Sequence, residues 1–223
     1  MSEKSKLIKT PLVAVDAVIF TVIENELKVL LAKIKYGPFI GKFGVPGGRV
    51  KIKETLEEAA KRELHEKTGV KNVYLEQLYS FGNLKRDPKT RIVSVAYFAL
   101  VNNNDVKLKA TGKYSDIGWF SVHKLGRLAY DHNDIIKYAL FRLKNKIKYT
   151  NIMYSLLSEK FTLSDLQKAY EITLEKKMDK RNFRKKILSS NLIKESGTKV
   201  GAPHRPSKLY SFKKREPVFI EMF

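Results

Sequence analysis

The sequence predicts an α+β fold made of a mixed domain, residues 1–148, followed by a smaller helical domain with a β-hairpin, residues 149–223. Strand-like and helix-like segments alternate over roughly the first 145 residues, which is typical of one packed unit. The chain then changes to successive short helical segments that end in two strand-like runs. No Pro- or Gly-rich linker separates the parts, so we expect them to pack directly.

The first elements follow from residue type and spacing. Residues 12–23 and 27–34 are rich in β-branched and aliphatic side chains and predict paired strands. Glycine and proline punctuate 35–48, which predicts a loop with short extended pieces. Residues 54–68 have helical periodicity, and Gly69 stands where a C-terminal cap belongs.

The remaining elements of this domain alternate in the same way. Strands are expected at 73–82 and at 91–101, and the second is so apolar that it should lie centrally. Trp119 and Phe120 end a further strand. Residues 131–147 predict an amphipathic helix that begins near Asp131 or Asn133.

The second domain predicts helices at 150–158, 163–171 and 180–190, followed by two strands around a flexible loop. Thr162 can cap the second helix in capping-box style with Asp165.

Charge and composition narrow the function. The chain holds 44 Lys and Arg against 23 Asp and Glu, a net charge of +21 that attracts polyanions such as nucleic acid. A lysine-rich solvated surface would give the same balance. The chain has no cysteine, so disulfides and cysteine-ligated zinc do not contribute. Neither a signal peptide nor a membrane-spanning run is visible, so we expect a cytoplasmic protein with no membrane partner.

A motif with catalytic spacing lies in the first domain. Gly48 is followed after five residues by Glu54 and, after seven more, by the run Arg-Glu-Leu-His-Glu-Lys-Thr-Gly-Val at 62–70. This pattern resembles the box of the Nudix hydrolase superfamily at every defined position except Lys67, which replaces the last glutamate. The resemblance covers roughly residues 10–145 and implies a Nudix-type α/β/α sandwich.

The physical logic of the box is that Glu63, Glu66 and position 67 cluster on one side of a helix. Carboxylates so placed could hold Mg²⁺, polarise a pyrophosphate and activate water. Lys67 favours an ion pair with Glu63 and opposes a nearby cation, at a cost on the order of several kcal/mol of metal affinity. We therefore expect at most residual catalysis by Glu63 and Glu66, which would be metal ligands only if the site retains a metal. If Lys67 is a tolerated surface substitution, Mg²⁺ binding survives.

Other residues are candidates for ligand binding. Arg62 and Glu54 could pair and fix the loop before the helix. Arg86 could bind phosphate or ribose oxygens, and Phe81 could stack on a base, although a turn salt bridge and a core aromatic are equally open. The full set of ligand-binding candidates is Gly47, Gly48, Arg62, Lys67, Phe81 and Arg86.

The second domain has the features of a DNA reader. Asp179 can cap a helix on which Phe183 and Ile187 face inward and cations face outward, as on a recognition helix in the major groove. The loop near 197–206 would form a wing that touches the DNA backbone. A dimerisation module is the alternative. The candidate DNA-binding residues are Lys180, Arg181, Arg184, Lys185, Lys199, His204 and Arg205.

The whole chain resembles the Nudix-related transcriptional regulators of NAD metabolism, through the altered box and the runs at 161–167, 179–186 and 204–210. The resemblance implies a winged helix-turn-helix domain and a homodimeric repressor that an ADP-ribose-like molecule releases from a double-stranded operator, with no cofactor required. Related regulators respond to sugars such as arabinose. The alternative functions are a Mg²⁺-dependent ADP-ribose pyrophosphatase, alone or combined with regulation, and general RNA binding.

Overall fold

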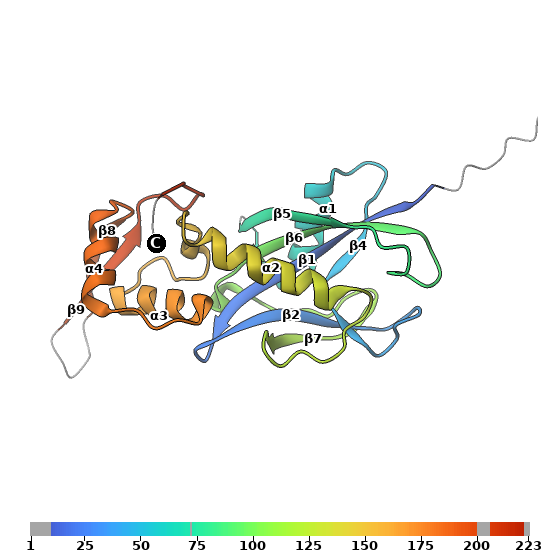
Figure 1. Cartoon of the computed structure of the whole chain (residues 1–223), viewed down its shortest axis with the longest axis horizontal. Helices are drawn as coiled ribbons and strands as arrows, with labels where there is room; N and C mark the ends of the chain where they lie inside the picture. The colour runs from blue at the N-terminus through green and yellow to red at the C-terminus, as the bar shows by residue number, and fades with distance from the viewer. Residues whose placement is uncertain (1–9, 72, 200–205, 221–223) are drawn as a thin grey trace, which may run out of the picture.

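The computed structural model describes residues 10–71, 73–199 and 206–220. The molecule is elongated, with a sheet-containing part and a helical part at opposite ends (Figure 1). Helix α2 (His132–Lys146) lies along the sheet-containing part, and its C-terminal end reaches the helical part. The sheet-containing part, for which the sequence predicts ligand binding, will be called the sensor domain, and the part after α2 the helical domain.

The sensor domain is built on a seven-stranded mixed sheet. Five strands follow the order β3-β2-β1-β6-β5; the other two lie off this path, with β4 paired to β1 and β7 paired to β2. Strands β1 and β6 are parallel over nine residue pairs, from Leu12 and Ile92 to Phe20 and Leu100. The strands are β1 (Leu12–Ile23), β2 (Glu26–Ile34), β3 (Phe43–Gly44), β4 (Gly47–Arg49), β5 (Tyr74–Phe81), β6 (Ile92–Leu100) and β7 (Tyr114–Ser121).

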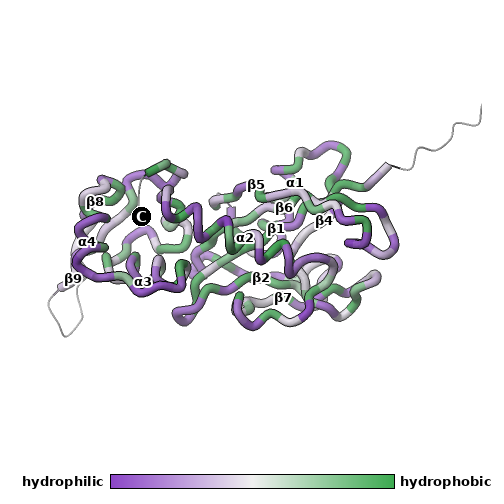
Figure 2. The backbone as a smooth tube through the Cα atoms, viewed as in Figure 1, coloured by the Kyte–Doolittle hydropathy of each residue, from purple (hydrophilic) through white to green (hydrophobic). Residues whose placement is uncertain are grey.

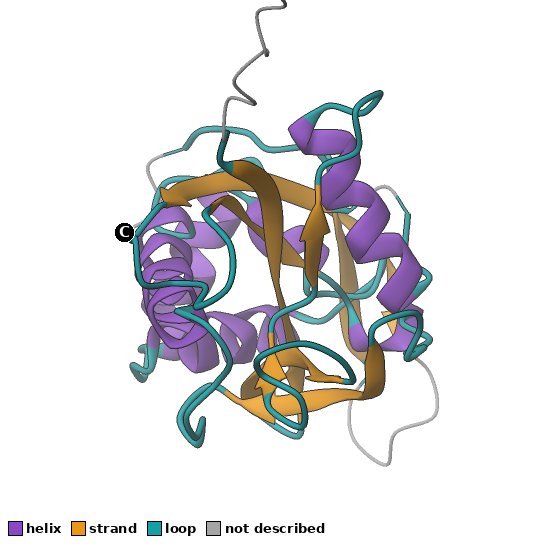
Figure 3. Ribbon diagram, turned by 90° about the vertical axis from the view of Figure 1, so that its right-hand side faces the viewer, coloured by secondary structure: helices purple, strands orange, loops and turns teal. Residues whose placement is uncertain are grey.

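Helices cover both faces of this sheet, as Figure 3 shows. Helix α1 (Leu56–Thr68) packs Leu64 and the neighbouring alanines against one face. It begins with a capping box between Thr55 and Glu58 and ends at Gly69, whose left-handed φ of 72° suits glycine. Helix α2 packs Ile135 and Ile136 against the other face. Strands β1 and β6 are therefore buried on both sides, as the nearly continuous apolar sequence at 91–101 predicts for β6.

The helical domain contains two capped helices and a hairpin. Helix α3 (Leu163–Leu174) begins with the predicted capping box of Thr162 and Asp165, and helix α4 (Lys180–Ser189) begins with Asp179 as its N-cap. Strands β8 (Ile193–Lys199) and β9 (Ser207–Phe212) pair antiparallel behind them. Hydrophobic residues gather in the central strands, whereas α4 is mostly hydrophilic (Figure 2).

The two parts pack directly, as the sequence predicts. One apolar cluster runs from Phe98 in the sheet through Leu143 on α2 to Tyr170 on α3. An ion pair joins α2 to the helical domain, where Lys144 contacts Glu175 at 2.8 Å, and another joins α2 to the sheet, where Lys146 contacts Glu76 on β5 at 2.8 Å.

The prediction of a helix at 150–158 is wrong. The structure has only a 3-10 turn, η2 (Ile152–Ser155), after Asn151. The buried Asn151 amide donates to the carbonyls of Lys214 and Glu216 and accepts from the Val218 N–H. Asn151 therefore binds the C-terminal segment instead of continuing a helix. A second 3-10 turn, η1 (Asn103–Asp105), follows β6. Among the described residues no helix is both long and apolar enough to span a bilayer.

Candidate functional site

A cavity of roughly 300 Å³ opens at the end of the sensor domain farthest from α4. It is bounded by β1, β4, the start of β7, the loop between β5 and β6, and the start of α2. The lining residues that bear on function are Asp16, Gly47, Gly48, Arg86, Lys113 and His132.

Two glycines shape the cavity floor. A Cβ at Gly47 would clash with the Asp16 carboxylate and with the Val15 carbonyl, and a Cβ at Gly48 would clash with the Glu63 carboxylate. Gly47 also donates its N–H to the Tyr114 hydroxyl at 3.0 Å. The glycine pair therefore lets acidic side chains approach the backbone from both sides.

Arg62 holds the loop before α1, as the sequence predicts. Its guanidinium donates to both Glu54 oxygens, from Nε at 3.0 Å and from Nη2 at 2.7 Å, and its Nη1 donates to Glu63 at 2.7 Å. The hydrogen bonds from Arg62 lower the pKa of Glu54 to about 2. Arg62 does not line the cavity; its contacts give it the predicted positioning role, and its contact with a ligand stays a prediction.

Lys67 is buried, and it pairs with Glu66 rather than with Glu63. Its ammonium lies 3.2 Å from Glu66 Oε2, donates to the Thr111 hydroxyl at 2.9 Å and stands 5.3 Å from the centre of the Tyr114 ring. No ion pair with Glu63 forms among the described residues. Lys67 does not line the cavity, and its contact with a ligand stays a prediction.

These contacts do not fit a divalent cation. Glu54 and Glu63 are paired with Arg62, and Glu66 is paired with Lys67, so each carboxylate of the box already faces a cation. In the described part of the chain, no three His, Asp or Glu side chains are grouped so that they could hold a metal ion. A hard cation needs several oxygen ligands that are free of competing positive charge.

A buried polar network closes one side of the cavity. Arg86 donates from Nε and Nη2 to Asp131, at 3.0 and 2.9 Å, and from Nη2 to Asp16 at 2.9 Å. Asp16 also accepts from Ser94 at 2.6 Å. Although burial raises the pKa of Asp16, the neighbouring His132, Arg86 and Ser94 hold it well below its usual range. Arg86 therefore lines the cavity with Nε and Nη2 already engaged, and Nη1 makes no hydrogen bond with a described residue.

His132 connects this network to the segment that follows strand β3. The Val45 N–H donates to its Nδ1 at 3.0 Å, so Nδ1 is an acceptor, and Nε2 stands 3.6 Å from Asp16. Gly44 is required here, because a Cβ would clash with the ring. Sequence reasoning gave His132 no role.

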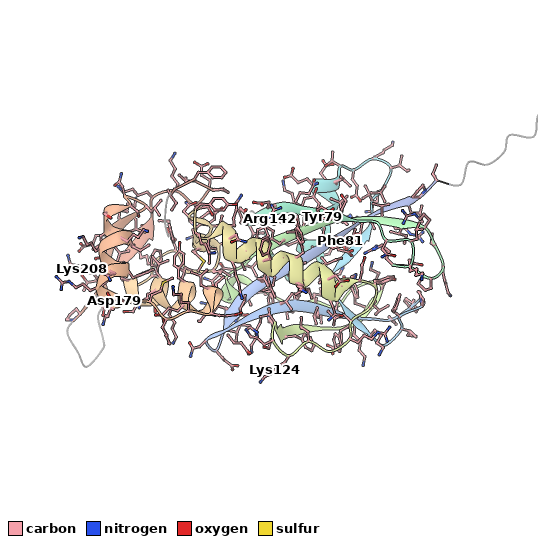
Figure 4. The ribbon with its side chains drawn as sticks, in the orientation of Figure 1. Tyr79, Phe81, Lys124, Arg142, Asp179 and Lys208 are labelled. Atoms are coloured by element: carbon pink, nitrogen blue, oxygen red, sulfur yellow. The ribbon has the colours of Figure 1, made fainter. Side chains whose placement is uncertain are left out.

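Phe81 does not line this cavity, and its stacking on a base stays a prediction. It packs against Tyr79 at 5.6 Å and Tyr138 at 6.3 Å between ring centres. Figure 4 shows Phe81 and Tyr79 together with Arg142 beside α2. Strand β5 thus places Phe81 against Tyr138 of α2.

Lys113 is the site residue that the sequence did not reveal. Its ammonium donates to the Gly47 carbonyl and lines the cavity. Burial of the ammonium lowers the pKa of Lys113, while Glu63 and Asp16 oppose that shift. The contact joins residues 66 positions apart, so no local motif signals it.

Helix α4 presents the predicted cations. Phe183 and Ile187 are buried, whereas Lys180, Arg181 and Lys185 are exposed and make no ion pair with the described residues. Arg184 is half-buried, and its Nε has no hydrogen-bond partner among them.

The hairpin lies at the same end of the molecule, where Figure 4 shows Asp179 and Lys208. Lys208 on β9 pairs with Glu195 at 2.9 Å. Of the predicted wing cations, the backbone of Lys199 ends β8, whereas the Lys199 side chain and residues His204 and Arg205 lie outside the described residues.

Two family models match the chain. The NUDIX domain model matches residues 12–141, and the NrtR DNA-binding winged helix domain model matches residues 153–212. The first match contains the cavity and the altered box, and the second contains α3, α4 and the hairpin.

Known proteins share this two-part arrangement. The ADPR responsive transcriptional repressor NtrR of Acinetobacter baylyi is 37% identical over 91% of this chain and 82% of its own length. The crystal structure of Shewanella oneidensis NrtR complexed with a 27mer DNA has a TM-score of 0.82 at 36% identity, covering 90% of this chain and 93% of that chain.

A second solved structure concerns the sensor domain alone. The cocrystal structure of the NUDIX domain of Shewanella oneidensis NrtR complexed with ADP ribose has a TM-score of 0.57 at 36% identity, covering 64% of this chain and 99% of that chain. Together with the matched models, these similarities show that the chain belongs to the NrtR family, in which a Nudix domain precedes a DNA-binding winged helix.

Proposed function

We propose that this protein is a transcriptional repressor that senses ADP-ribose, or a related metabolite, in its Nudix domain and binds operator DNA through its winged helix. One observation carries the proposal: the cavity that would hold the ligand lies at the start of α2, and the end of α2 contacts α3 of the domain that would hold DNA. A repressor homologue that responds to ADPR supports the same assignment.

The DNA contacts are assigned to α4 and the hairpin. Lys180, Arg181 and Lys185 are free to meet phosphates and base edges, because their charges are not neutralised by described neighbours. Arg184 is half-buried on the same helix and is proposed as a DNA contact from its place beside Lys185. Lys199, His204 and Arg205 are proposed as wing contacts from their place in the sequence.

The ligand is assigned to the cavity floor and walls. Gly47 and Gly48 allow close approach of a diphosphate, and Nη1 of Arg86 makes no hydrogen bond with the described residues, so it is available for a polar group. Tyr36 and Tyr130 add aromatic walls of the kind that nucleotide ligands use. A pentose such as arabinose is the alternative effector and would leave the diphosphate subsite empty.

Regulation in this proposal requires no cofactor, and hydrolysis is at most residual, because the carboxylates of the box are paired with Arg62 and Lys67. The competing function is a Mg²⁺-dependent ADP-ribose pyrophosphatase, alone or combined with regulation. Glu63 and Glu66 remain in the box and would be its metal ligands. Release of AMP from ADP-ribose in the presence of Mg²⁺ distinguishes the two functions.

The proposed protein is a homodimer, because winged helices commonly read two-fold operators as dimers. The proposed division of the chain is residues 1–148 for ligand binding and 149–223 for DNA binding.

The experiment that tests the proposal is fluorescence anisotropy of a labelled duplex from the protein's own promoter region, compared with a scrambled duplex of equal length. Binding at least a hundredfold tighter to the promoter duplex at physiological salt is expected, since specific sites typically exceed non-specific ones by roughly 10³ or more. Equal affinity for both duplexes would overturn the regulatory function. A thermal-shift screen with ADP-ribose, NAD and arabinose then identifies the effector, because a ligand of the folded state raises the apparent stability.

A further inference from the structure

Lys67 replaces the last carboxylate of the Nudix box. The structure shows two ammonium groups near the remaining carboxylates of the box, those of Lys67 and Lys113. Lys67 neutralises Glu66 from behind the cavity wall, and Lys113 enters the cavity itself and donates to the Gly47 carbonyl. Both ammonium groups make cation–π contacts with Tyr114, each with its Nζ 5.3 Å from the centre of the ring. The aromatic ring therefore supports both cations.

We propose that Lys113 is a resident cation that binds the diphosphate of the ligand directly, and that Lys67 and Lys113 together replace the divalent metal of the box. For the identity of the ligand, this inference rests on the proposed function. An ammonium has three donors, and the described residues supply one acceptor, the Gly47 carbonyl. Two N–H groups of Lys113 thus remain for phosphate oxygens in the cavity.

The neighbouring charges favour this role for Lys113 over Lys67. The Lys67 ammonium is held by Glu66 and Thr111 and does not line the cavity. Lys113 makes no ion pair within 4.0 Å in the described part of the chain, although Glu63 and Asp16 are close enough to act on its charge. A phosphate would give Lys113 the direct anionic partner that the protein does not supply.

The same arrangement opposes a metal. A divalent ion beside Gly47 would meet the Lys113 ammonium, and it would have to displace Arg62 from Glu63 and Lys67 from Glu66 to obtain carboxylate ligands. Each displacement costs an ion pair in a partly desolvated site. Ligand binding should therefore be independent of Mg²⁺.

The test has two titrations of the full chain. In the first, calorimetry measures ADP-ribose binding in EDTA for the wild type, Lys113→Met, Lys113→Arg and Lys124→Met, and the wild type is also titrated with ADP-ribose in the presence of Mn²⁺. Lys124 is an exposed lysine of the sensor domain that does not line this cavity, and it controls for the loss of one positive charge. Lys113→Met should bind at least roughly tenfold more weakly, the scale of one lost charge-assisted hydrogen bond. Lys113→Arg and Lys124→Met should stay within about threefold of the wild type on the same scale.

In the second titration, Mn²⁺ alone is added to the wild type and to the double variant Lys67→Glu, Lys113→Met, and bound Mn²⁺ is measured by electron paramagnetic resonance. The double variant should bind Mn²⁺ at least roughly tenfold more tightly, because two cations are removed and one carboxylate is restored. Circular dichroism melts establish that each variant is folded.

Three results would overturn the inference: ADP-ribose binding by the wild type that EDTA abolishes, unchanged affinity in Lys113→Met, or equal Mn²⁺ binding by the wild type and the double variant. If ADP-ribose fails to bind both in EDTA and with Mn²⁺, the proposed ligand is wrong. In that case the Mn²⁺ titration alone tests whether Lys67 and Lys113 replace the divalent metal.

Discussion

Arg86 and Asp131 form a bidentate ion pair, in which Nε and Nη2 of the arginine lie 3.0 and 2.9 Å from the two carboxylate oxygens. Arg86 belongs to a cavity loop, and Asp131 is the residue immediately before α2. The carboxylate is held by Arg86 and makes no N-cap hydrogen bond to α2. At the other end of α2, Lys144 contacts Glu175, which ends α3. A ligand that alters the Arg86–Asp131 pair therefore acts on α2, which reaches from the cavity to α3 of the helical domain.

The first prediction concerns this connection. Asp131→Asn replaces an ion pair with a weaker neutral contact and should reduce the effect of ADP-ribose on operator affinity at least fivefold, a coupling change on the order of 1 kcal/mol. Operator affinity without ligand should change less. Asp134→Asn is the matched control, because Asp134 is exposed in the same turn of α2 and forms no ion pair with a described residue. Anisotropy titrations with and without ADP-ribose measure the coupling, and equal responses of the two variants would exclude this path.

The second prediction concerns the cavity floor. Gly48→Ala places a methyl group against the Glu63 carboxylate, which is held by Arg62 and has little freedom to move. The substitution should lower the free energy of unfolding by about 1–3 kcal/mol and weaken ADP-ribose binding. Gly126→Ala is the control, because its new methyl group meets no atom within 4 Å. Urea melts of both variants check this, and a Gly48→Ala protein as stable as Gly126→Ala would show that the floor is loosely packed.

The third prediction concerns pH. The folded-state pKa of Glu54, about 2, lies below its ordinary value of 4.5, mainly because Arg62 donates hydrogen bonds to it. A lowered carboxylate pKa stabilises the fold fully above the ordinary value, and the contribution is lost as pH falls from 4.5 toward 2. The stability difference between wild type and Glu54→Gln should thus be constant near neutral pH and shrink below pH 4.5.

Glu57→Gln serves as the control for this prediction, since Glu57 forms only an exposed pair with Lys61. Exposed pairs of this kind contribute little. Denaturant melts at a series of pH values give the comparison. A difference between wild type and Glu54→Gln that grows on acidification would contradict the assigned origin of the low pKa.

The fourth prediction concerns the DNA face. Arg181→Ala and Lys185→Ala remove exposed cations of α4 and should each weaken operator binding. If the lost contact is to phosphate, the slope of log affinity against log salt falls by roughly one for each residue. Lys137→Ala, an exposed cation on α2, should leave both quantities unchanged. Salt-dependent anisotropy is the measurement, and equal effects of all three substitutions would indicate attraction by net charge alone.

The sequence predicted the parts of the site that are local. Glu54 and Arg62 lie eight positions apart across one loop and one helix, so their pairing follows from the box itself. The caps at Thr162 and Asp179 follow likewise from residue type and spacing. These features depend on neighbours in the chain, and the structure confirms them.

The parts that sequence reasoning missed depend on strand register and on distant contacts. Lys113 reaches Gly47 because β7 pairs with β2, where a register shift at Ile34 sets the position of Tyr114. Lys67 pairs with Glu66 because Thr111, brought in from a distant loop, holds its ammonium. Phe81 faces α2 because alternation along β5 fixes its side, and the sequence does not say which side meets the ligand.

The most direct test of the account is the anisotropy of the operator complex as ADP-ribose is added in EDTA. The account predicts release of the DNA at saturating ADP-ribose, with the added dinucleotide recovered intact. Operator binding that stays unchanged under saturating ADP-ribose, or release that occurs only as the dinucleotide is cleaved after Mg²⁺ is restored, would contradict it.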